Sequence, residues 1–144
     1  MDNDLNVQII VSEDMEVHQV GQNQINKVVN PVLIMRVPFV PTGLSLAVTI
    51  ITAGIDFSKE HKLEIFIFDP EKNEKLYTTN ESGFNLPNMT SDNFNFNLDL
   101  KNVPFRHNGK FEVHFVLDDE PVIHEFKVIG NEDLNNPGAS NGEQ

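Results

Sequence analysis

Histidines and carboxylates are the residues of this sequence whose types could bind a metal or transfer protons. The chain has five histidines, no cysteine and 22 acidic residues. A zinc site needs three or four nitrogen, sulfur or carboxylate ligands brought to one point. His114 and His124 are expected on neighbouring strands but on opposite faces, so they cannot share a metal ion. The remaining histidines lie in polar connections without a second ligand at useful spacing: His18, His61 and His107.

One acidic segment has part of the spacing of a calcium-binding loop. Asp69, Glu71 and Asn73 stand at the first, third and fifth ligand positions of such a loop. Its glycine position is occupied by Glu74, and Asn80 stands where a bidentate acid is needed. The segment is dense in residues that favour turns, so the sequence predicts a hairpin turn here, without a metal ion.

Motifs for covalent or phosphate chemistry are missing from the sequence. The serines lack the Gly-x-Ser-x-Gly pattern, there is no cysteine nucleophile, and no glycine-rich phosphate loop is present. Two carboxylates from distant positions can still converge in a folded protein, and the sequence alone leaves that route open. We therefore predict a protein that is not an enzyme and that carries no cofactor.

Charge and hydropathy narrow the choice of partners and compartment. The formal net charge of −12 disfavours direct binding to nucleic acid or to anionic membranes. The acidic run 118–120 is explained equally well by an exposed turn and by weak cation binding. The acidic start, Met1–Asp4, predicts no signal peptide, and the apolar segments 32–40 and 44–55 are too short and interrupted to span a bilayer. With no cysteine for disulfides, we expect a soluble cytoplasmic protein.

Alternating apolar and polar residues predict strands throughout the chain. The strongest signal is a hairpin over residues 109–129, for which the apolar pattern favours Leu117 opposite Val122. That register places His114 beside Glu125 on the polar face. Further strands are expected over residues 5–12, 44–53, 63–68, 75–78 and 94–100.

The remaining segments are expected to connect or to flank these strands. Residues 28–41 carry three prolines, which cannot donate ladder hydrogen bonds, so they suit an edge strand or an extended connector. Residues 13–24 and 80–93 are predicted as polar connections, and 130–144 as a disordered tail. Together these patterns predict one all-β domain over 1–129, a two-layer antiparallel sandwich of about seven to eight strands.

The last third of the chain resembles the closing strands of immunoglobulin-like sandwiches. The resemblance is carried by residues 98–105, 109–113 and 118–122, where a glycine and an aromatic residue introduce the penultimate strand. Residues 37–42 and the Asp69–Pro70 turn resemble an uncharacterised group of small bacterial and phage proteins of this architecture. The resemblance implies an immunoglobulin-like fold, although the chain has no cysteine and no tryptophan, and it assigns no functional residue.

Two functions fit these observations. The first is a protein-binding module, in which the proline-rich segment or an exposed sheet edge adds a partner strand or forms a homodimer. The second is an acidic decoy that imitates nucleic acid and blocks a basic surface of another protein. Moderate salt should disrupt the decoy and spare an apolar interface. The residues predicted to contact a partner are apolar side chains that a small sandwich need not bury: Val29, Ile34, Phe39, Val116 and Ile123. The alternative is that these side chains pack against the N-terminal segment of the same chain.

Overall fold

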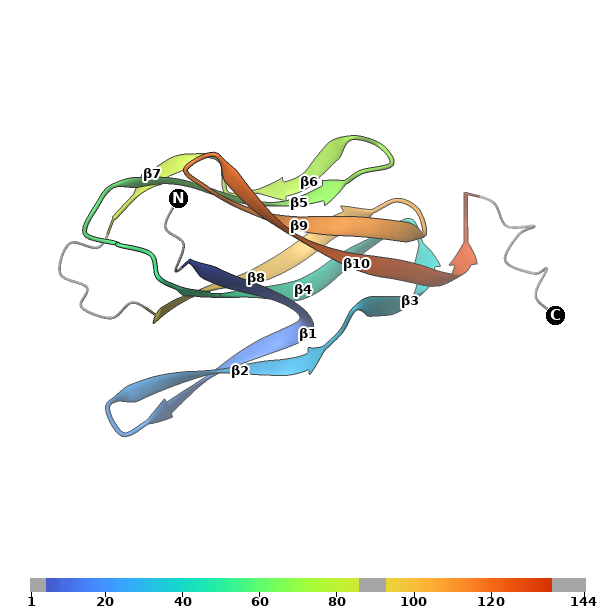
Figure 1. The fold of residues 1–144 in the computed structure, drawn as a ribbon. Coiled ribbons are helices and arrows are strands. Elements are labelled where there is room, and N and C mark those ends of the chain that lie inside the picture. Colours follow the sequence, from blue (N-terminus) through green and yellow to red (C-terminus); the bar gives the residue numbers. More distant parts are fainter. Residues whose placement is uncertain (1–4, 86–92, 136–144) are drawn as a thin grey trace.

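Two β-sheets packed face to face form the structure, a computed structural model that describes residues 5–85 and 93–135 (Figure 1). The described part contains ten strands and no helix, which confirms the predicted all-β sandwich and exceeds the predicted strand number. In chain order the strands are β1 (Asn6–Val20), β2 (Asn23–Pro31), β3 (Ile34–Val40), β4 (Thr42–Ala53), β5 (His61–Asp69), β6 (Glu74–Thr78), β7 (Ser82–Phe84), β8 (Asn93–Phe105), β9 (Gly109–Leu117) and β10 (Glu120–Asp133).

The strand order explains which segments lie at the edges of the sheets. One sheet has the order β2-β1-β4-β8, and the other has β3-β10-β9-β5-β6, with β7 also paired to β5. The proline-containing segment supplies β3 and the end of β2, which both lie at sheet edges, as predicted. β3 runs parallel to β10, so the sandwich is not purely antiparallel. Between β2 and β3 the chain crosses from one sheet to the other at Pro31–Leu33.

Large aromatic side chains fill the space between the sheets. Phe105, Phe111, Phe115 and Phe126 are at most 1% exposed and come from β8, β9 and β10. Phe105 and Phe111 meet edge to face with ring centroids 4.9 Å apart. Such a pair contributes about 0.5–1.5 kcal/mol beyond the area that it buries. The alternation that predicted these strands therefore reflects one buried face on each.

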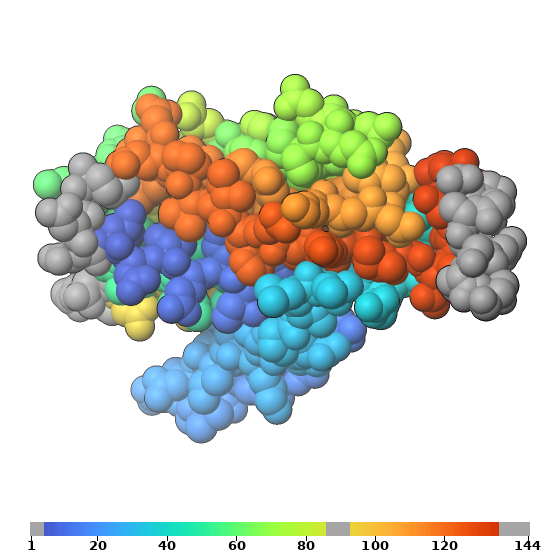
Figure 2. Space-filling model, turned by 45° about the vertical axis from the view of Figure 1, so that its right-hand side comes forward, coloured from blue at the N-terminus to red at the C-terminus, as the bar shows by residue number. Residues whose placement is uncertain are grey.

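A two-stranded arm replaces the connection that was predicted over residues 13–24. β1 continues through this segment and pairs with β2, whereas its pairing with β4 ends at Ser12. The arm projects away from the sandwich in both views (Figures 1 and 2). Val17, Val20 and Ile25 are each about half exposed. Because neither face of the arm is fully buried, its sequence shows no alternation, and the prediction of a connection was wrong.

The β9–β10 hairpin is tighter than predicted. Leu117 pairs with Glu120, not with Val122, so the loop consists of only two residues. These are Asp118 and Asp119, with φ of 52° and 67°, the left-handed conformation of a type I′ turn. The register differs from the prediction by two residues. A shift of two residues keeps every side chain on its face, so the apolar pattern could not distinguish the two registers.

The last strand extends past the predicted end of the domain at Ile129. β10 continues to Asp133, and the N–H of Leu134 donates to the carbonyl of Val40 over 2.8 Å. At Gly130 an added Cβ would lie 2.8 Å from the backbone nitrogen of Val40, so only glycine permits this approach of β10 to β3. The predicted disorder of residues 136–144 lies outside the described residues.

Candidate functional site

β10 is paired on both sides along only part of its length. β3 covers one edge of it from Lys127 to Asp133, beginning where the N–H of Lys127 donates to the carbonyl of Leu33 over 2.9 Å. Over residues 120–126, β9 pairs with the opposite edge. Within residues 5–85 and 93–135, no strand pairs with the outer edge of this segment. We call residues 120–126 of β10 the free edge.

The backbone groups of the free edge can be assigned by alternation along the strand. In an antiparallel pair, successive residues direct their N–H and C=O groups alternately toward the partner and away from it. The N–H of Lys127 points toward β3, so Ile123 and Glu125 direct their backbone groups to the same open side. Pro121 offers only a carbonyl there. The free edge thus presents two donors and three acceptors to an added strand.

β1 is also half paired on this side of the molecule. Its pairing with β2 begins at Ser12, so residues 6–11 have β4 as a strand partner on one edge only. On the other edge of this segment, one backbone hydrogen bond is formed outside the strand pairs: the N–H of Val32 donates to the carbonyl of Val11 over 2.9 Å. In Figure 2 the orange-red β10 runs directly above the dark blue β1. In the part of the chain that the structure describes, no strand joins the two sheets on this lateral face of the sandwich. We call the face between residues 6–11 of β1 and residues 120–126 of β10 the open side.

Two hollows lie along the open side. The larger, about 380 Å³, includes Leu5, Leu117 and Glu120 in its lining. The smaller, about 190 Å³, lies beside Ile9 and His124. Each hollow is therefore lined from both sheets. The larger lies at the beginning of the free edge, beside Glu120, and the smaller lies farther along it, beside His124.

Exposed apolar side chains surround the free edge. Leu33 is 66% exposed, Ile34 42% and Ile123 51%. Ile34 pairs with Lys127, and Ile123 with His114, so both side chains lie on the outer face of the larger sheet. This pairing brings two residues of the predicted contact set to the same edge of the sheet.

The other predicted contact residues are distributed differently. Val116 shares the outer face but is only partly exposed beside Pro121. Val29 is partly buried where β2 pairs with β1. Phe39 is 44% exposed at the far end of β3, opposite Glu132. Val29 and Phe39 therefore lie away from the free edge.

His61 closes one end of the open side. Its Nδ1 lies 2.7 Å from Oδ2 of Asp118, and its Nε2 lies 2.7 Å from the carbonyl oxygen of Asp56. Burial opposes the charged imidazolium, but the bonds to Asp118 and to the Asp56 carbonyl outweigh it and raise the pKa of His61. Both ring nitrogens already contact an oxygen atom, so neither points to an open position where a metal ion could bind. Through its contact with Asp118, His61 joins the β9–β10 turn to the start of β5.

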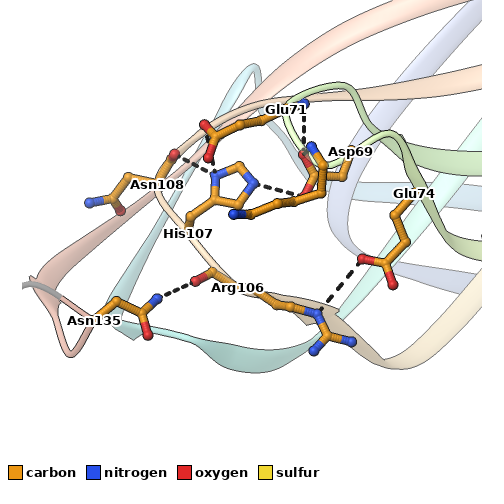
Figure 3. A network of polar contacts seen from close by, with 8 residues as sticks. Asp69, Glu71, Glu74, Arg106, His107, Asn108 and Asn135 are labelled. Atoms are coloured by element: carbon orange, nitrogen blue, oxygen red, sulfur yellow. Dashed lines mark hydrogen bonds and ion pairs between the residues drawn. The ribbon is translucent and has the colours of Figure 1, made fainter.

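His107 occupies a similar position in a polar network at the other end of the sandwich (Figure 3). Its Nε2 lies 2.7 Å from Oδ2 of Asp69, and its Nδ1 lies 2.8 Å from the carbonyl oxygen of Asn108. Asp69 also accepts the backbone N–H groups of Glu71 and Lys72, so the predicted hairpin turn is confirmed. The network joins the β5–β6 and β8–β9 turns.

The two strand histidines differ from their predicted contacts. His114 bonds Glu112 of its own strand over 2.8 Å, because the actual register moves Glu125 away from it. His124 is partly buried as predicted, but its buried Nε2 has no hydrogen-bond partner. Burial lowers the pKa of His124. The described residues contain no group of three or more His, Asp or Glu side chains placed to hold a metal ion.

Sequence reasoning missed the ion pairs of His61 and His107. Their partners lie 57 and 38 residues away in the chain, respectively, so no local spacing indicates them. A signal for the tight turn was available, because aspartate tolerates positive φ and two aspartates follow each other at 118 and 119.

The two packed sheets make this chain a β-sandwich protein. Residues 8–128 match the model of DUF6941, a family of unknown function. The chain belongs to this family. No curated protein matches the sequence.

Solved structures with a similar chain path include a β-glucosidase from Listeria innocua. Its complex with glucose matches 88% of this chain with a TM-score of 0.47 and 10% identity. Its complex with isofagomine gives a TM-score of 0.42 at the same identity. This chain spans 16% of the length of the enzyme. No helix in the described residues is long and apolar enough to cross a membrane.

Proposed function

We propose that this chain is a non-enzymatic protein-binding module that adds an extended segment of a partner to the free edge of β10. The unpaired backbone groups of Ile123 and Glu125 carry the proposal. An added strand would hydrogen-bond to them and bury part of Leu33, Ile34 and Ile123. Each backbone hydrogen bond contributes about 0.5–1.5 kcal/mol net, so the apolar contacts must supply part of the affinity.

The surroundings of the free edge support a protein segment as the occupant. An extended chain supplies the N–H and C=O groups that an unpaired edge requires. The net charge of −12 favours a segment with basic residues. Within this proposal we group the sandwich with immunoglobulin-like domains, on the basis of its two packed sheets, and we place the protein in the cytoplasm.

A proline substitution in the free edge tests the proposal. Glu125→Pro removes an N–H that points outward, and it leaves the ladder between β9 and β10 intact. Glu125→Gln is the matched control, because it also loses the 3.9 Å ion pair with Lys110 but keeps the N–H. Random nine-residue peptides displayed on phage provide the ligands. Peptides selected on the wild type should bind the glutamine variant and not the proline variant, while both variants keep the wild-type circular dichroism spectrum.

The same experiment distinguishes the second function. Selected peptides that bind the proline variant equally well would overturn strand addition at this edge. If that binding is also lost at moderate salt and the peptides are polybasic, the acidic decoy is the better assignment.

A further inference from the structure

The two hollows of the open side lie in line with the free edge. Glu120 borders the larger hollow and His124 the smaller, and these residues are four positions apart on β10. On the facing sheet, Leu5, just before β1, and Ile9 of β1 border the same two hollows with the same separation. Four residues of a strand span about 13 Å. Residues separated by four positions also lie on the same face of a strand.

The larger hollow has an unbalanced negative charge beside an apolar wall. Leu5, Ile55 and Leu117 form the apolar part of its lining. Two of its carboxylates are already paired: Asp56 with Lys59 at 3.9 Å, and Asp118 with His61 at 2.7 Å.

Glu120 also borders this hollow and has no ion pair among the described residues. A lysine or arginine side chain fits such a site, because its methylene stem can pack on apolar residues while its charged end meets the carboxylate.

The smaller hollow is almost entirely apolar. Its lining includes Ile9, Val11, Val32 and Leu33, and His124 is the only ionisable residue there. Burial lowers the pKa of His124 and so favours the neutral imidazole. An uncharged wall of this kind favours an aliphatic side chain.

Resting on the proposed function, we infer that the added segment is recognised by a basic residue and an aliphatic residue four positions apart. The basic side chain enters the hollow beside Glu120, and the aliphatic one enters the hollow beside His124. The backbone of the segment pairs with Ile123, between the two hollows, and with Glu125, just beyond the smaller one. The partner is therefore a protein with a short, exposed, extended segment of this pattern.

Designed peptides test this spacing directly. The probe is a nine-residue threonine- and serine-rich peptide with lysine at position 3 and valine at position 7, together with a second peptide in which these two residues are exchanged. In the spacing control the valine is moved by one position, and in the charge control glutamate replaces lysine. Fluorescence anisotropy measures binding, and the amide signals of Ile123 and Glu125 report where it occurs.

The preferred order of the two residues will give the direction of the added strand. At least one of the two peptides should bind about tenfold more tightly than both of its controls, which corresponds to about 1.4 kcal/mol. Glu120→Gln should abolish the difference between the lysine and glutamate peptides. Glu132→Gln, on the same strand but far from the hollow, should leave it unchanged.

The outcomes distinguish the inferred residue pattern from the proposed strand addition on which it rests. If peptides shift the amide signals of the free edge and lose binding in Glu125→Pro, but the spacing and charge controls bind equally well, only the inference is overturned. If no extended peptide, designed or selected, affects those signals, the proposed function fails as well.

Discussion

At His61 and His107 each ring nitrogen contacts an oxygen atom, and this geometry determines what these side chains do. When it is protonated, the ring donates to a carboxylate and to a backbone carbonyl in both cases. The contacts with the carboxylates join segments that are distant in the sequence and so stabilise the fold. The two residues hold turns together at opposite ends of the sandwich.

His107→Gln should destabilise the protein in a pH-dependent way. Burial opposes the charge of His107, but the bonds to the Asn108 carbonyl and to Asp69 outweigh it and raise its pKa. A group whose pKa is raised by folding contributes stability below its unfolded pKa of 6.5, and this is lost as pH rises through the folded value. We expect a loss of about 1–3 kcal/mol near pH 6 and a smaller loss near pH 9, measured by urea denaturation.

The exposed pair of Lys101 and Asp99 provides the control for this measurement. Its 3.3 Å contact is at least half exposed on both sides, so Lys101→Gln should change stability by less than about 0.5 kcal/mol at either pH. An equal loss at both pH values in His107→Gln would show that the charge of the ring is unimportant.

His124→Leu should have the opposite pH dependence. Burial lowers the pKa of His124, so the unfolded chain binds a proton more readily than the folded chain below the ordinary pKa of 6.5. The wild type therefore loses stability as pH falls through this range, and the leucine variant does not. The melting temperature of the variant relative to wild type should be higher at pH 5 than at pH 8. His18→Gln in the exposed arm, with its side chain 49% exposed, serves as the control.

At the scale of single elements, the β9–β10 turn sets the position of the free edge. Asp119 has φ of 67°, where glycine is the favoured residue of a type I′ turn. Asp119→Gly should raise the unfolding free energy by about 1 kcal/mol, because it relieves the left-handed conformation. The ion pair that it removes, with Lys62 at 3.7 Å, is largely exposed and contributes little. A decrease in the urea midpoint would contradict this interpretation of the turn.

Elements were predictable from the sequence where a buried face imposes a pattern. Residues 94–100 alternate strictly because Leu100 and its same-face neighbours point inward, and the strand was found as β8. The arm beyond Ser12 buries little, so its strands left no pattern to detect. The free edge was not predictable either, because an unpaired edge depends on where β3 ends relative to β10, and no local sequence encodes that relation.

At the scale of the whole molecule, the arm and the sandwich separate into independent parts. No residue of the core comes from the segment between Ser12 and Met35. Replacing residues 17–26 by an Asn-Gly turn should therefore change the unfolding free energy by less than about 1 kcal/mol, which is the range of surface changes. Thermal denaturation measures the effect, and the amide signals of Ile123 and Glu125 should be retained. A large loss of stability would show that the arm supports the fold.

The free edge also bears on how the protein behaves in concentrated solution. An edge that accepts a foreign strand can equally accept a strand of another copy, and such pairing is the first step of ordered fibre growth. At neutral pH the net charge of −12 keeps copies apart. The isoelectric point of about 4.6 means that acidification removes this colloidal protection. Mildly acidic storage should therefore produce fibres or precipitate, and an occupant of the edge should keep the protein in solution.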